Sequence, residues 1–238
     1  MLDILTFIIE WIGKLPIFNK LKAHQKRQLS NLTFYKNLLP KEKRKFEYRV
    51  SRFIKEHHFV GRKEFKITSS VQLGIASIAI MLTFRLKKYL FNHFENIIVY
   101  PKDYFSLHTG AIHKGETNPR AKTIVFSWEG FVEGIKIEND NLNLGIHEFS
   151  HALFFSFFKQ TNSEARNFIK QCKEVFLFLT DAKKKHKVVS SNYLREYAFV
   201  NQHEFLAVIT ENYFETPNEF QKKLPALFSA VNKLYKIY

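Results

Sequence analysis

Two histidines and a glutamate stand together in the segment His147-Glu148-Phe149-Ser150-His151, the stretch of this sequence with the clearest chemistry. Residues four apart lie on one face of an α-helix about one turn apart, so both imidazole rings can reach one metal ion. Glu148, beside the first histidine, can take a proton from a water molecule held by that ion. The spacing predicts a zinc site with His147 and His151 as ligands and Glu148 as general base.

The setting of this segment is almost entirely apolar, which predicts a buried helix. The apolar neighbours are Ile146, Phe149, Leu153, Phe154, Phe155, Phe157 and Phe158. Charge is costly to bury without partners, and a divalent cation would compensate the three titratable groups. The alternative is a chance pattern with two ordinary core histidines, and the apolar setting argues against it.

A zinc site of this kind needs a third protein ligand, and no histidine follows at the spacing found in metzincins. A later predicted helix, Asn201 to Glu215, carries Glu204, Glu211 and Glu215 on one stripe. Glu204 is the candidate ligand, although it also fits a first-turn residue that answers a cap at Asn201. Glu211 fits either an acceptor that orients a ligand histidine or a plain helix-face carboxylate.

These two helices resemble those of the Mlc titration factor A family of bacterial zinc peptidases, which is related in its active-site region to anthrax lethal factor. The residues that carry the resemblance are the HEFSH segment, Tyr197, and Glu204-Phe205-Leu206-Ala207-Val208 with Glu211, besides Ile124 to Trp128 followed by Gly134, and Pro225-Ala226-Leu227. The resemblance implies His147, His151 and Glu204 as Zn²⁺ ligands and Glu148 as general base. It also implies a Tyr197 hydroxyl near the substrate carbonyl, for which the alternative is a packed core tyrosine.

The elements that must position these residues predict an α+β fold, mostly helical and zincin-like, with a small β-sheet beside the HExxH helix. The predicted helices and strands are Val71 to Leu90, Asn96 to Pro101 (strand), Lys122 to Trp128 (strand), Asn143 to Lys159, Ser163 to Leu179, Asn201 to Glu215, and one helix from Pro217 to the end. The basic run Lys183 to Lys187 is the nearest thing to a linker. We expect the loops at Leu107 to Pro119 to line a specificity pocket.

The domain prediction is a basic helical region at residues 1–90 and a zincin-like catalytic region at 91–238, or one continuous domain. The formal net charge is +15, and Met1 to Lys63 contributes 15 Lys and Arg against 5 Asp and Glu. No RRM, zinc-finger or basic-zipper pattern accompanies this charge, which argues against nucleic acid as a partner. Met1 to Gly13 is apolar and too short to span a bilayer, so peripheral membrane contact is the minority expectation.

The single cysteine, Cys172, cannot form an internal disulfide, which fits a reducing compartment and predicts a cytoplasmic protein. The sequence therefore predicts a zinc-dependent metallopeptidase that hydrolyses a peptide or protein substrate, with an aminopeptidase as the form that the resemblance suggests. The alternative is a zinc-stabilised binding protein that sequesters a regulatory protein partner with little catalysis.

Overall fold

The structure is a computed structural model and describes residues 20–237. Its elements, in chain order, are α2 (Ala23–Leu29), α3 (Thr33–Lys36), α4 (Pro40–Glu56), β1 (His58–Gly61), α5 (Ser69–Thr83), β2 (Asn96–Tyr100), β3 (Tyr104–Ser106), β4 (Ala111–His113), β5 (Gly115–Asn118), β6 (Thr123–Ser127), α6 (Trp128–Lys136), α7 (Leu144–Phe158), α8 (Ser163–Thr180), α9 (Ala182–Ser190), the 3-10 helix η2 (Glu196–Phe199), α10 (Gln202–Glu215), α11 (Pro217–Lys223) and α12 (Pro225–Tyr235). The expected α+β, mostly helical fold is confirmed. Met1 to Gly13, where peripheral membrane contact was the minority expectation, lies outside the described residues.

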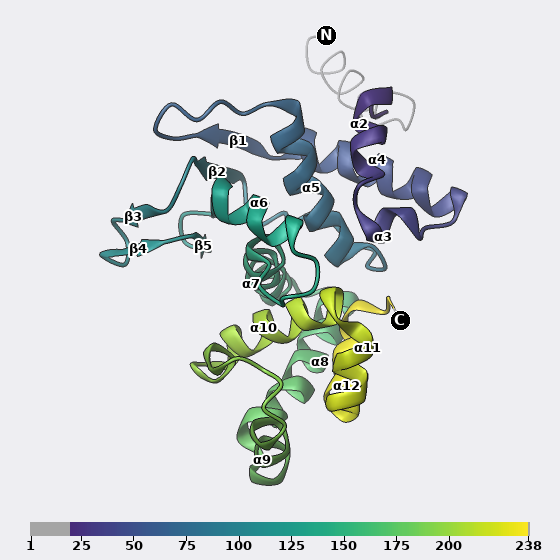
Figure 1. Cartoon of the computed structure of the whole chain (residues 1–238), viewed down its shortest axis with the longest axis vertical. Coiled ribbons are helices and arrows are strands. Elements are labelled where there is room, and N and C mark those ends of the chain that lie inside the picture. The colour runs from purple at the N-terminus through teal and green to yellow at the C-terminus, as the bar shows by residue number, and fades with distance from the viewer. Residues whose placement is uncertain (1–19, 238) are drawn as a thin grey trace.

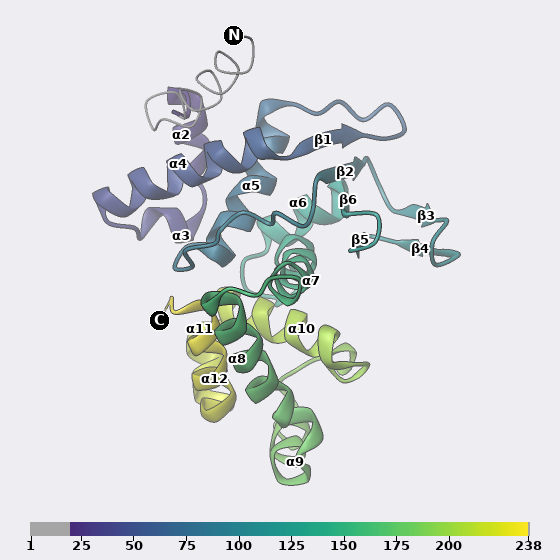
Figure 2. The same cartoon turned by 180° about the vertical axis from the view of Figure 1, so that it is seen from behind.

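A small mixed sheet has the strand order β1-β2-β6-β5. Strands β1, β2 and β6 are parallel, while β5 runs antiparallel to β6 and forms one edge. Side chains of β2 alternate between buried and partly buried, and those of β6 are buried after its first residue, as a central strand requires. A separate hairpin, β3–β4, projects from the molecule next to this sheet (Figures 1 and 2).

Helix α7 lies between the sheet and the C-terminal helices, in the middle of the molecule (Figure 1). It contacts α5, β5 and β6 on one side and α8 and α10 on the other. The residues of α7 that keep some exposure follow one stripe at helical spacing, namely Leu144, His147, His151, Phe155 and Phe158. Both histidines of the HExxH segment therefore face the same open side of an otherwise buried helix.

One hydrophobic cluster contains buried residues from both sides of residue 90. Phe53 of α4, for example, packs against Phe91 and against Phe149 of α7, with ring centroids 6.1 and 5.9 Å apart. Aromatic rings supply much of the buried area, so the phenylalanine-rich composition is used in the core. The division near residue 90 stays a prediction.

Two expected helices differ in the structure. The helix expected to reach Leu90 ends at Thr83, where the carbonyl oxygens of Thr83 and Phe84 accept hydrogen bonds from buried Arg49 instead of continuing the helix. The helix expected from Pro217 to the end is broken at Leu224, because Pro225 lacks the amide proton and begins a new helix, α12.

Two further expectations are wrong. The run Lys183 to Lys187 is no linker but part of helix α9, whose first turn is capped by the Asp181 side chain. The short strand β1 lies within residues 1–90, which were expected to be helical. Within residues 20–237, no helix is both long and apolar enough to cross a membrane.

Candidate metal centre

The two histidines of α7 lie in the first turns of a helix whose N-terminus is capped by a side chain. Asn143 is the N-cap residue, and its Oδ1 accepts the backbone N–H of Ile146 at 3.0 Å. One turn further on, His147 and His151 direct their rings to the same side, with their Nε2 atoms 3.2 Å apart. The local sequence thus produces the pair of ring nitrogens that the spacing predicts.

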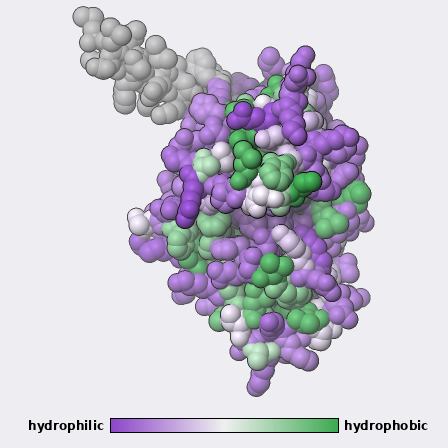
Figure 3. Space-filling view, turned by 90° about the vertical axis from the view of Figure 1, so that its left-hand side faces the viewer, coloured by the Kyte–Doolittle hydropathy of each residue, from purple (hydrophilic) through white to green (hydrophobic). Residues whose placement is uncertain are grey.

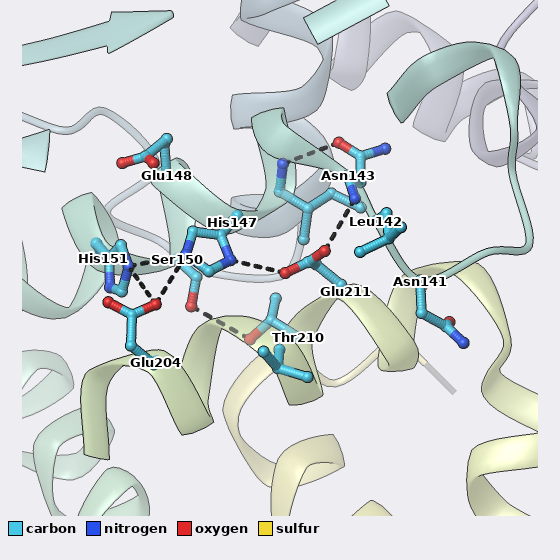
Figure 4. Close-up of polar contacts among 12 residues, drawn as sticks. Asn141, Leu142, Asn143, His147, Glu148, Ser150, His151, Glu204, Thr210 and Glu211 are labelled. Atoms are coloured by element: carbon cyan, nitrogen blue, oxygen red, sulfur yellow. Dashed lines mark hydrogen bonds and ion pairs between the residues drawn. The ribbon is translucent and has the colours of Figure 1, made fainter. Parts of the chain in front are cut away.

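Glu204 completes a three-residue cluster from the facing helix α10. Its Oε2 atom lies 3.0 Å from Nε2 of His147 and 3.6 Å from Nε2 of His151 (Figure 4). Asn201 accepts the backbone N–H groups of His203 and Glu204, which caps the helix and leaves the Glu204 carboxylate directed at the histidines. The cluster His147, His151 and Glu204 is a group that could hold a metal ion.

The donor set fits a small divalent cation. Zinc bonds of about 2.0–2.1 Å to nitrogen and oxygen imply edges of about 3.3 Å in a tetrahedral site, and the three separations of 3.0, 3.2 and 3.6 Å bracket that value. Oε2 of Glu204 is buried and finds no partner of good hydrogen-bond geometry among residues 20–237, although the imidazoles are close. A buried acceptor that faces two ring nitrogens needs a cation among them.

The pKa shifts of the cluster also indicate a site for a cation. Burial by itself would lower the pKa of His147, but the Glu204 and Glu211 carboxylates outweigh it and raise the pKa to about 10. Burial by itself would raise the pKa of Glu204, yet its contacts with the two histidines lower it well below the usual range. The site therefore favours positive charge next to His147, which a metal ion would supply in place of the proton.

Glu211 lies on the other side of His147 and is buried (Figure 4). Its Oε1 is 2.7 Å from Nδ1 of His147. An ionised carboxylate can only accept, so Nδ1 carries a proton and Nε2 is left to face the metal position. Glu211 thus stands where a residue that orients a ligand histidine must stand.

Two partners of Glu211 were missed by the sequence analysis. Arg195 donates to both carboxylate oxygens, at 3.1 and 2.7 Å, and the backbone N–H of Asn143 donates to Oε2 at 2.9 Å. The Asn143 side chain also donates to the Gly134 carbonyl and to Glu215, at 2.7 and 3.0 Å. Arg195 stands outside any periodic segment, so no pattern in the sequence marked it; a buried carboxylate predicted at Glu211 was the one available hint that a cation must lie nearby.

Glu148 is buried and lies on the other side of the histidine rings from Glu204 (Figure 4). Thr117, on the edge strand β5, donates its hydroxyl to Oε2 of Glu148 at 2.8 Å and to the backbone carbonyl of Glu148 at 3.0 Å. A Cβ at Gly115, also on β5, would lie 2.7 Å from Oε1 and 2.7 Å from Cδ1 of Leu144, so a larger residue here would displace the carboxylate or the leucine. Burial raises the pKa of Glu148, which the nearby histidines partly oppose.

Tyr197 lies in η2, and its ring centroid is 5.9 Å from that of His147. Its side chain is 49% exposed, so it lines an opening and is not packed in the core. Burial of part of the ring and the nearby Glu204 carboxylate raise its pKa to about 12. The hydroxyl therefore stays protonated at neutral pH and can donate a hydrogen bond.

A cleft of about 570 Å³ opens beside these residues. His147, Glu148, Arg195, Tyr197 and Glu211 all line it. Its size lies within the range of small-molecule and substrate sites, about 300–1,000 Å³. His147 and Glu148 are thus reachable from solvent through this cleft.

Comparison with known proteins decides the family. A model of the family described as glucose-regulated metallo-peptidase M90 matches residues 14–236. The chain belongs to this family. It is also similar to the uncharacterized protein slr2042 of Synechocystis sp. strain PCC 6803, with 25% identity over 248 residues that cover 95% of this chain and 88% of the relative. The resemblance to the Mlc titration factor A family is confirmed.

Membership in a metallopeptidase family implies a metal ion, and the His-His-Glu cluster is a site for one. The family match covers most of the basic N-terminal part and both helices that carry the His-His-Glu cluster. The structure brings all six sequence-predicted residues, His147, Glu148, His151, Tyr197, Glu204 and Glu211, to the same place, and their individual roles are part of the proposal below.

Proposed function

We propose that this protein is a zinc-dependent peptidase that uses His147, His151 and Glu204 as ligands and Glu148 as general base. The observation that carries the proposal is the convergence of the three donor atoms, 3.0 to 3.6 Å apart, beside a buried carboxylate in an open cleft. This is the donor set of a catalytic zinc site with three protein ligands and one open position. Membership in a metallopeptidase family supports the reaction class.

The chain's own residues account for the proton transfers. A zinc ion, when bound, supplies a Lewis acid that polarises the scissile carbonyl and acidifies water. Glu148 accepts the proton of the attacking water and delivers it to the leaving amine, and its raised pKa makes it a stronger base than an exposed glutamate. Thr117 holds Oε2 of Glu148, and the glycine at position 115 leaves room for Oε1. Tyr197 donates to the oxyanion as it develops.

The substrate in this proposal is an extended peptide. Strand β5 is the edge of its sheet and carries both Gly115 and Thr117, which contact the general base. A peptide that adds to this edge as a further strand would bring its carbonyl groups past the metal position. Aminopeptidase-like cleavage is the narrower form of the proposal, and chromogenic substrates with free and blocked amino termini distinguish it.

The test combines metal analysis with hydrolysis of a panel of chromogenic peptides by the zinc-loaded full chain. We expect one zinc per chain and turnover by the wild type, zinc without turnover in Glu148→Gln, and loss of tight zinc binding in Glu204→Ala. Glu174→Gln, an exposed glutamate on α8, is the matched control and should behave as the wild type. Full zinc retention by Glu204→Ala would show that the third ligand is another residue.

A zinc-bound wild type and Glu148→Gln variant that both lack turnover would favour the other candidate, a zinc-stabilised protein that sequesters a regulatory partner. The excess positive charge of Met1 to Lys63 supports that reading, since a basic surface attracts acidic partners. A cytoplasmic location belongs to the proposal in either case and is supported by the single, buried Cys172.

A further inference from the structure

Large apolar side chains converge on the cleft beside Glu148 from four different elements. Ile112 of β4 is 72% exposed, Ile137 at the end of α6 is 50% exposed, and Leu142 in the following loop is 55% exposed. All three line the cleft, together with Leu144 at the start of α7. Single exposed apolar residues are ordinary on protein surfaces, but several around one cavity indicate a binding site.

The charged groups of the same cleft already have partners within the protein, either an opposite charge or a hydrogen-bond donor. Among residues 20–237 that line it, Lys114 lies 3.6 Å from Glu133, and Arg195 is bonded to Glu211. Glu148 accepts the Thr117 hydroxyl, and Asp140 accepts the backbone N–H of Leu142. The lysine and the arginine of the cleft are thus each paired with a carboxylate, so an acidic substrate side chain would find no free cation among them, whereas an apolar side chain would bury surface on both sides.

The apolar surface continues outward along the β3–β4 hairpin. Phe105 pairs across the strands with Ile112, and the two are 57% and 72% exposed. Leu107, in the turn, is 93% exposed. Figure 3 views the molecule from the side of this hairpin and shows hydrophobic residues gathered on that face. The hairpin thus extends the apolar wall of the cleft away from the metal position.

We propose that the cleft is a specificity pocket for a large apolar side chain, such as leucine or phenylalanine, on the substrate residue that adjoins the cleaved bond. The inference rests on the proposed peptidase function and names its substrate class. His147 and Glu148 line the same cavity as Ile112 and Leu142, so a side chain held there places its own backbone next to the general base. Ile112, on strand β4, lies within the segment, residues 107–119, that the sequence indicated for specificity.

The expected preference is large enough to measure. Burying a leucine-sized side chain changes binding by roughly ten- to a hundredfold relative to glycine, and the cost of moving the charge of lysine or glutamate from water to the apolar walls disfavours those residues further. We therefore expect kcat/KM for a leucine or phenylalanine peptide to exceed that for the glycine, lysine or glutamate peptide by at least about tenfold.

The test uses internally quenched peptides that are identical except at one position, with the cleaved bond located by mass spectrometry. Ile112→Glu and Leu142→Glu should each lower kcat/KM for the leucine peptide by about tenfold and reduce the disadvantage of the lysine peptide. Leu177→Glu, an equally apolar and 40% exposed position on α8 away from the cleft, is the control and should leave both values unchanged. Equal rates for all peptides, or preferences untouched by both cleft variants, would overturn the proposal.

A binding measurement separates this inference from the peptidase proposal. Fluorescence anisotropy with zinc-loaded Glu148→Gln reports the affinity of labelled leucine and glycine peptides without turnover. Tighter binding of the leucine peptide with no hydrolysis by the wild type would support the pocket and reject the peptidase. Equal affinities would reject the pocket whether or not the wild type hydrolyses peptides.

Discussion

Replacing Glu211 by glutamine tests the network that supports the metal centre. The Glu211 side chain is 1% exposed and accepts from His147, from the backbone of Asn143 and twice from Arg195. Every one of these partners is a donor. In Glu211→Gln one carboxylate oxygen becomes an NH₂ group. Each oxygen accepts two hydrogen bonds, so in either orientation of the amide two of the four donors face an NH₂ group that cannot accept.

The magnitude follows from those contacts. A hydrogen bond to a charged group contributes about 1.5–3 kcal/mol, so loss of two predicts about 3–6 kcal/mol, in line with about 3–5 kcal/mol for breaking a buried ion pair. Arg195 keeps some access to water, which favours the lower end, about 3 kcal/mol. Under the proposal that His147 is a zinc ligand, loss of the acceptor that orients it should also weaken zinc binding by about 10- to 100-fold.

Two measurements check this. Urea unfolding of the metal-free protein gives the change in unfolding free energy, and competition with a chromogenic chelator gives the zinc affinity. Glu174→Gln on α8 is the matched control and should change neither. A Glu211→Gln variant with wild-type stability and a zinc affinity within about twofold of the wild type would refute the reasoning, since a change within twofold amounts to less than about 0.5 kcal/mol.

Three further predictions concern residues around Glu148 and the start of α7. Thr117→Val removes the hydroxyl that holds Glu148, so kcat should fall by about tenfold, in keeping with one net hydrogen bond, while zinc affinity is kept. Gly115→Ala places a Cβ about 2.7 Å from Oε1 of the same glutamate, so kcat should fall while the variant stays folded. Burial raises the pKa of Glu215 to about 7, so the folded state holds an additional proton between about pH 4.5 and 7 and stability falls as pH rises through that window. Glu215→Gln lacks this ionisation and should lose less stability between pH 5 and 8, by at most about 3 kcal/mol and by less where water reaches the carboxyl.

Each of these predictions has a control variant or an outcome that would contradict it. Thr117→Ser keeps the hydroxyl and should restore turnover; a serine variant as slow as the valine one would point to packing instead. Gly115→Ala with an unchanged kcat would show that the strand shifts freely away from the carboxylate. Melting curves at several pH values measure the Glu215 effect, and parallel curves for wild type and variant would contradict it.

Much of the metal centre could be predicted because it depends on short-range periodicity. The His147 and His151 spacing and the stripe of Glu204 and Glu211 are properties of single helices, and a helix of known period places their side chains without knowledge of the rest. That α7 and α10 face each other could be expected because both predicted helices carry charged side chains in apolar surroundings, and buried charges need partners.

What could not be predicted depends on contacts between distant segments. The early end of α5 at Thr83 results from Arg49, 34 residues away, which occupies its carbonyl oxygens. Thr117 supports Glu148 across 31 residues, and nothing local distinguishes it from any strand threonine. The basic run at Lys183 to Lys187 looked like a linker, but the Asp181 cap and helix-forming lysines make it a helix.

Three glutamates of helix α10 contact residues at the start of α7 and thereby fix how the two helices align. Glu204 meets the histidine pair, Glu211 meets His147 and the Asn143 backbone, and Glu215 meets the Asn143 side chain. The three glutamates are separated by seven and four residues, or about 10 and 6 Å along the helix axis at 1.5 Å per residue. Inserting or deleting one residue between Glu204 and Glu215 would rotate the glutamates that follow by about 100° around the helix axis and remove them from their partners on α7, whatever residue was chosen. We expect natural length variation to spare this helix and to accumulate in exposed connections.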